Sequence, residues 1–261
     1  MMLQLKGPEP QLKIRHPSHH FNLFGRLFWV AMTLIGCRSF SAQAEDIQTN
    51  AVKLRSPPSW VRAVDVRRIT AKIEAKLEWS TRRTEVYWYA TPEAFAAIHN
   101  YGSAPLAVTT SSPTASVVHL GPKVTPENFA VVFGHELVHV IINQKYRGAV
   151  PKWLEEGLAN HLAKAKPVDY KWLAKFPLPQ DVYELSHPLH GSSENVLYRY
   201  KASQALIEML AKKCDLENLL RLSVQRKMED YIKTYCEISD LNQAYQAWVK
   251  KMSTQAAPRS P

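Results

Sequence analysis

Two histidines spaced four residues apart constrain this chain more than any other feature. They lie in Gly134-His135-Glu136-Leu137-Val138-His139, inside a stretch whose apolar residues recur at helical spacing. Residues i and i+4 of a helix project from one face a turn apart, so both imidazoles can share one metal ion. Zinc binds imidazole nitrogens at about 2.0–2.1 Å. Glu136, next to the first histidine, can reach a water at the metal without itself binding the metal.

A second motif contains candidates for a third ligand. It reads Pro151-Lys152-Trp153-Leu154-Glu155-Glu156-Gly157-Leu158-Ala159 and is expected to open a helix that runs to about Lys164. Glu155 and Glu156 are about 100° apart around such a helix, so they cannot both face one metal ion. The helix dipole favours an acid in the first turn without any ligand, which makes a solvated acid the simpler reading of Glu155.

Together the two motifs resemble those of the gluzincin metallopeptidases, and most closely the peptidase MA-like proteins. The resemblance implies that the glutamate before Gly-Leu-Ala, which is Glu156, is the third zinc ligand beside His135 and His139. It also implies that Glu136 is the general base in hydrolysis by zinc-activated water. The two motifs span residues 134–159, and looser similarity runs from about 85 to 252.

The resemblance also singles out one tyrosine. In aminopeptidase-like gluzincins, a tyrosine ahead of the apolar stripe of a later helix donates a hydrogen bond to the tetrahedral intermediate. When that stripe is aligned on Leu206, Ile207 and Leu210, Tyr200 takes this position and Tyr198 is the weaker candidate. The alternative is that Tyr200 is a half-buried packing aromatic.

The order of predicted elements favours an α+β fold, with a small N-terminal sheet followed by a mainly helical half. Strands are expected at 85–89, 106–110 and 115–120. A first helix is expected to bury Val66, Ile69, Ile73 and Leu77. Later helices are expected from Thr125 to near Gly148 and at 195–213, 216–236 and 241–252, with an irregular loop over 166–194.

By resemblance, the fold is a zincin-like gluzincin domain. In that fold a strand just before the metal helix forms the edge of the cleft, which here is the segment 115–120. An extended substrate can pair with such a strand through main-chain hydrogen bonds. The alternative for 115–120 is an ordinary core strand.

The amino terminus has the features of an export signal. Basic residues precede an apolar run at 27–36, which is short for a membrane span. Ala42 and Ala44 then match the A-x-A pattern of a signal-peptidase site, so residues 1–44 are expected to be removed. This predicts a protein of the bacterial periplasm or extracellular space, without a membrane span after cleavage. A lipobox-like sequence ending at Cys37 leaves a lipoprotein as one alternative, and an uncleaved anchor is the other.

The rest of the chain is expected to form one domain. A polar linker is expected over 45–58, the gluzincin domain over 59–252 and a disordered tail over 253–261. Cys214 and Cys236 are an even pair in an exported chain, which favours a disulfide over two buried thiols.

Charge and motifs together limit the classes of partner. The net charge is +10, but the basic residues are scattered, which argues against nucleic-acid binding. The sequence therefore predicts an exported zinc metallopeptidase acting on a peptide or protein substrate. A zinc hydrolase for another bond and a catalytically silent binding module are the alternatives. Glu136 argues against silence, because metal binding alone does not require it.

Overall fold

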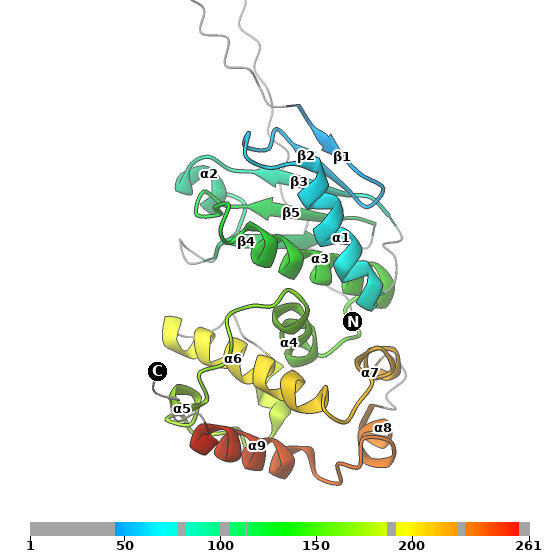
Figure 1. Cartoon of the computed structure of the whole chain (residues 1–261), viewed down its shortest axis with the longest axis vertical. Coiled ribbons are helices and arrows are strands. Elements are labelled where there is room, and N and C mark those ends of the chain that lie inside the picture. Colours follow the sequence, from blue (N-terminus) through cyan, green and yellow to red (C-terminus); the bar gives the residue numbers. More distant parts are fainter. Residues whose placement is uncertain are drawn as a thin grey trace, which may run out of the picture. The chain divides into compact units, whose positions relative to one another are not determined.

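A five-stranded mixed sheet followed mostly by helices gives this protein its α+β fold (Figure 1). The structure, a computed structural model, describes residues 45–77, 82–99, 105–112, 114–186, 192–223 and 228–255. These residues belong to one unit of the chain, Ala42–Pro261. The predicted export signal and residues 256–261 of the predicted tail lie outside the described residues.

The sheet has the strand order β1-β2-β3-β5-β4. Its strands are β1 (Ile47–Gln48), β2 (Val52–Arg55), β3 (Thr84–Trp88), β4 (Ala107–Ser111) and β5 (Ser116–Leu120). The central strands β2, β3 and β5 are parallel, whereas β1 and β4 pair antiparallel with their neighbours. The segment 115–120 is therefore an inner strand. The edge lies one strand earlier in the chain, at β4, because β5 pairs on its other side with β3.

The segment 45–58, expected to be a polar linker, instead supplies β1 and β2. Val52 and Leu54 are fully buried and alternate with Lys53 and Arg55, which is the period-two pattern of a strand with one buried face. The pattern covers only four residues and is followed by a proline pair. Sequence periodicity alone therefore reads it as a linker.

The helices that hold the site follow largely as predicted. The helices are α1 (Ala63–Leu77), α2 (Pro92–Ala96), α3 (Phe129–Tyr146), α4 (Lys152–Leu162), α5 (Tyr170–Leu173), α6 (Ser193–Leu210), α7 (Leu216–Ser223), α8 (Met228–Thr234) and α9 (Leu241–Gln255), with a 3-10 helix η1 (Val182–Ser186). α3 begins later than expected, because the Asn128 side chain accepts a hydrogen bond from the Thr125 amide and holds a turn ahead of the helix. α5 and η1 lie in the segment expected to be an irregular loop. None of the described helices has the length and apolar character needed to cross a membrane.

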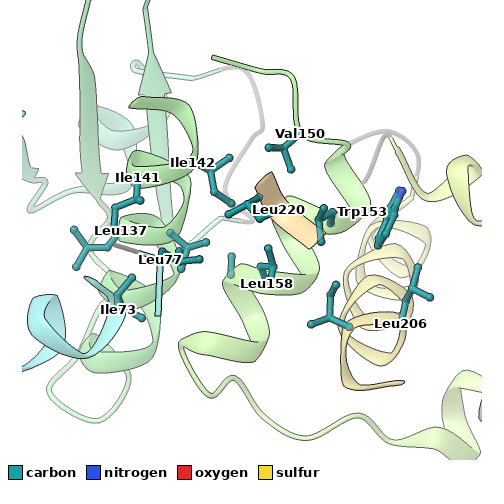
Figure 2. Close-up of a cluster of buried hydrophobic side chains, with 14 of the residues drawn as sticks. Ile73, Leu77, Leu137, Ile141, Ile142, Val150, Trp153, Leu158, Leu206 and Leu220 are labelled. Atoms are coloured by element: carbon teal, nitrogen blue, oxygen red, sulfur yellow. The ribbon is translucent and has the colours of Figure 1, made fainter. Parts of the chain in front are cut away.

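A continuous apolar core joins the sheet to the helical half. α3 packs on β4, β5 and α1 on one side and on α4 on the other, and α4 in turn packs on α6. Figure 2 shows this sequence of layers, from Leu137 and Ile141 of α3 through Leu158 of α4 to Leu206 of α6. α4 is therefore held between two helices.

The contact between α4 and α6 leaves no room for a side chain at Gly157. A Cβ atom there would lie 2.5 Å from both the Ser203 carbonyl oxygen and Cγ1 of Ile207. Because one of these neighbours is backbone, a larger residue would push the two helices apart. The glycine in the second motif thus allows α4 to reach α6.

The segment 216–236 is not the single helix that its pattern predicts. It folds into α7 and α8, which pack against each other. Cys214 and Cys236 flank this pair at disulfide distance, with Cα atoms 5.0 Å apart. A continuous helix over 216–236 would separate its ends by roughly 30 Å, so the cysteine pairing requires the chain to reverse direction.

Loss of the cysteine pair should destabilise the protein. The cysteines are 22 positions apart. Closing a loop of that length stabilises the folded protein by about 3 kcal/mol in the chain-entropy model. We expect Cys214→Ser to lower the unfolding free energy by up to that amount in denaturant titrations. Cys236→Ser and the double variant should match it. Alkylation of two thiols in the non-reduced, folded protein would contradict the pairing.

Candidate metal centre

Two helices bring three metal-ligand side chains together. His135 and His139 project from α3, and Glu156 projects from α4, which packs against α3. The two Nε2 atoms are 3.0 Å apart. Oε2 of Glu156 lies 3.5 Å from Nε2 of His135 and 3.6 Å from Nε2 of His139. The three residues chosen from sequence therefore converge on one point.

The spacing of these donor atoms fits a small metal ion. Ligands at about 2.0–2.1 Å around a tetrahedral ion are separated by about 3.3–3.4 Å, which is close to the three separations observed here. The carboxylate-to-imidazole distances are too long for hydrogen bonds. Oε2 of Glu156 is buried and has no hydrogen-bond partner among the described residues. Glu156 as a whole is only 5% exposed. A buried charged oxygen of this kind needs a partner, and a cation between the three donors supplies one.

Glu155 is not the solvated acid that its place in the first helical turn suggests. It is 8% exposed, and its Oε1 accepts a hydrogen bond at 2.7 Å from Nδ1 of His139. Its Oε2 pairs with Nζ of Lys152 at 2.5 Å. As the angle between them requires, Glu155 and Glu156 do not both face the point where the ligands converge, and Glu156 is the one that does. Glu155 faces the other nitrogen of a ligand ring instead.

This contact sets how His139 presents itself to a metal. A hydrogen bond from Nδ1–H to the carboxylate places the proton of the neutral ring on Nδ1, so the lone pair remains on Nε2. The same bond fixes the orientation of the ring. Carboxylates that hold metal-binding histidines in this way are a common feature of zinc sites. Lys152 neutralises the buried charge that Glu155 brings.

Burial and neighbouring charges act in opposite directions on the pKa values here. Burial by itself lowers the pKa of His139, but the carboxylates of Glu156 and Glu155 outweigh it and raise that pKa well above its usual value. Burial by itself raises the pKa of Glu156, and His139 and His135 outweigh it and lower that pKa. The carboxylates are thus held ionised around a point that favours positive charge. A divalent cation satisfies the same preference.

Glu136 lies beside the ligands but is held by the sheet. Its side chain is 6% exposed, and Oε2 accepts a hydrogen bond at 2.6 Å from the Thr109 hydroxyl on β4. Glu136 is not one of the three converging ligands. The residue after the first ligand is thus a buried carboxylate whose position is fixed by the edge strand.

The two candidate tyrosines of α6 face different surroundings. The Tyr200 ring centroid is 6.4 Å from that of His135. The Tyr198 ring stacks on Phe176, and its hydroxyl donates to the Pro177 carbonyl at 3.0 Å. Tyr200 is therefore the tyrosine whose ring lies near a ligand. Tyr198 instead contacts the segment between α5 and η1.

Sequence reasoning did not identify Thr109, Lys152 or the contact made by Glu155. Lys152 and Glu155 are three positions apart in the second motif, so their ion pair could have been predicted from the spacing along a helix. No sequence pattern could have identified Thr109, because its contact with Glu136 depends on the packing of α3 on the sheet.

Comparison with known proteins adds nothing to the identification of this chain. No protein-family model matches it, and no curated protein shows significant similarity to it.

Metal analysis of adjacent variants tests the division of roles between Glu156 and Glu155. We expect one divalent ion per chain in the purified protein, and its loss in Glu156→Ala, His135→Ala and His139→Ala. Glu155→Ala should retain the ion with about 10–100-fold lower affinity, since it loses only the partner of a ligand. Glu155→Gln keeps an oxygen acceptor for Nδ1–H and should lose less. The assignment is wrong if Glu155→Ala loses the ion and Glu156→Ala binds it normally in chelator competition.

Proposed function

We propose that this protein is a zinc-dependent metallopeptidase with a gluzincin-like active site. The observation that carries the proposal is the convergence of His135, His139 and Glu156, and it is joined by the buried Glu136, which follows His135 on α3. Three protein ligands leave one coordination position open, as catalytic zinc sites require. Two imidazoles and one carboxylate, with no thiolate, are a donor set that suits catalytic zinc.

When bound, the zinc ion lowers the pKa of a coordinated water toward about 7 and polarises the carbonyl of the substrate. Glu136 accepts the proton of the attacking water and passes it to the leaving amine. The Thr109 hydroxyl holds one oxygen of this carboxylate, which leaves the other for the proton. A silent binding module has no need of such a base, so the buried Glu136 favours an enzyme.

The edge strand favours a peptide as the substrate. Leu106 pairs with Gly121 and Ser112 with Ala115 through backbone hydrogen bonds to the β5 side. Hydrogen-bonded and non-hydrogen-bonded pairs alternate in an antiparallel ladder. The intervening residues Ala107, Thr109 and Ser111 therefore turn their own N–H and C=O groups away from β5.

These outward groups give an extended peptide a strand to pair with. Thr109 presents its main chain at this edge while its side chain holds Glu136. A peptide paired along β4 therefore passes next to the catalytic base. A small ester or other non-peptide substrate would make no use of this row of groups, which is why a peptidase is the better proposal.

Tyr200 is the candidate donor to the reacting carbonyl oxygen. Attack on the carbonyl develops negative charge on that oxygen, and the hydroxyl of a tyrosine whose ring lies near that of His135 is a candidate to donate a hydrogen bond to it. Tyr198 is bound to the Pro177 carbonyl and is not a second candidate.

We also propose that the protein works in an oxidising compartment outside the cytoplasm. The support is the pairing of Cys214 and Cys236 at disulfide distance, because structural disulfides persist in oxidising compartments.

Glu136→Gln separates catalysis from metal binding. The amide has the shape of the carboxylate but takes no proton, so zinc content should stay normal while peptide turnover falls by about 10²–10⁴-fold. Turnover is measured by mass spectrometry on a peptide mixture, with and without chelator. Near-normal turnover in Glu136→Gln would refute the assignment of the base.

Tyr200→Phe and Tyr198→Phe form a matched pair that removes one hydroxyl from each side of α6. Tyr200→Phe should lower kcat by about 10²–10³-fold with little change in KM or zinc content, because the lost bond acts on the transition state. Tyr198→Phe should leave kcat nearly unchanged. The role moves to Tyr198 if the two results are exchanged, and to another group if both variants behave as the parent protein.

A further inference from the structure

A pocket lies along β4, beyond the metal centre. It has a volume of about 360 Å³ and is lined by Ser111, Ser112, Asn143, Arg147 and Gly148. None of these residues belongs to the metal ligands, the general base or its hydroxyl partner. The pocket combines the end of the edge strand with the C-terminal end of α3.

The pocket lies at a fixed distance along β4 from the residue that holds the catalytic base. Ser111 lies two residues after Thr109 on β4, roughly 6.7 Å along the strand. Thr109 and Ser111 pair with Val118 and Ser116, and their side chains share the face of the sheet that α3 covers. Asn143 lies seven residues after Glu136, about 10.5 Å along α3 in the same direction.

A peptide on β4 therefore presents one particular side chain to the pocket. Residues directly opposite each other on paired strands point to the same face. If the cleaved bond lies beside Thr109, the substrate residue opposite Ser111 is about two positions away and points toward α3. Antiparallel pairing is the more stable arrangement, and it places this residue on the N-terminal side of the cleaved bond.

The chemistry of the lining favours an acidic side chain. Arg147 is exposed and forms no ion pair with any described residue. Ser111 and Ser112 line the strand side of the same pocket, where the Ser111 hydroxyl pairs with that of Ser116 and the Ser112 hydroxyl donates to the Ala115 carbonyl. The Arg147 guanidinium is therefore the charged group that the pocket offers, and its fork is the complement of a carboxylate. Gly148 has no atom within 4 Å of the position a Cβ would take, so this side of the pocket is open.

We propose that Arg147, with Ser111 and Ser112 at the end of β4, forms a subsite for an acidic substrate residue, about two positions to the N-terminal side of the cleaved bond. This rests on the proposed peptidase function, because it uses the same edge strand. Arg147 also caps the negative end of the α3 dipole, where a cation is favourable without any ligand. The test must therefore measure how peptide affinity depends on substrate charge, and not the stability of the protein.

Binding to the zinc-loaded Glu136→Gln chain tests the subsite without turnover. The probes are fluorescent eight-residue peptides with blocked termini that carry Glu, Gln or Lys at one position and are otherwise identical. The Glu peptide should bind about fivefold more tightly than the Gln peptide, and raising the salt to about 0.5 M should reduce the difference. Adding Arg147→Ala should remove the preference. Adding Arg147→Glu should reverse it in favour of Lys.

Lys72→Glu makes the same charge change at an exposed position of α1 and should keep the preference for Glu. The subsite is refuted if the Glu and Gln peptides bind equally, or if the preference survives both Arg147 substitutions. Turnover by the unsubstituted chain is then scored separately. Preferential binding without any cleavage would refute the peptidase and leave the subsite. Cleavage with no dependence on Arg147 would leave the peptidase and refute the subsite.

Discussion

The close contact between α4 and α6 is the constraint on which the site depends. Gly157 permits it, because any side chain there would meet the Ser203 carbonyl. The residue before this glycine is Glu156, and one turn before Ser203 on α6 is Tyr200. α4 also packs on α3, so a single helix between two others brings the third ligand and the tyrosine to the histidines. The core in Figure 2 is what keeps these three helices in register.

Three buried carboxylates at one place would be costly without compensation, and each is compensated differently. Glu136 is held by a hydroxyl from the edge strand. Glu155 is paired with Lys152 and with Nδ1 of His139. Glu156 has an oxygen that no described group hydrogen-bonds. The differences separate three roles among acids that look alike in sequence: a base, a residue that orients a ligand, and a ligand.

Local pattern predicted most of the helices and the histidine pair, because spacing along a helix fixes which side chains share a face, and the resemblance to the gluzincins added Glu156. It did not predict what depends on contacts distant in sequence. The order of strands made β4 rather than 115–120 the edge. Helical pattern predicted one helix over 216–236, whereas the cysteine pairing that the sequence also predicted agrees with the observed pair of helices, α7 and α8. The angle between Glu155 and Glu156 allowed only one of them as a ligand, and the resemblance to the gluzincins selected Glu156. The hydrogen bond between Nδ1 of His139 and Glu155 depends on the packing of α4 on α3, so it could not be predicted from local pattern.

X-ray absorption at the zinc edge, measured on the full chain loaded with one equivalent of zinc, tests the metal centre most directly. A centre of His135, His139 and Glu156 should give nitrogen and oxygen scatterers only, at about 2.0–2.1 Å, with the outer-shell pattern of two imidazoles. With either histidine replaced by alanine, the zinc should no longer be held at this centre, so the outer-shell pattern of the two imidazoles should disappear. A sulfur shell, or a spectrum that has no imidazole scattering and is unchanged in both histidine variants, would contradict the account.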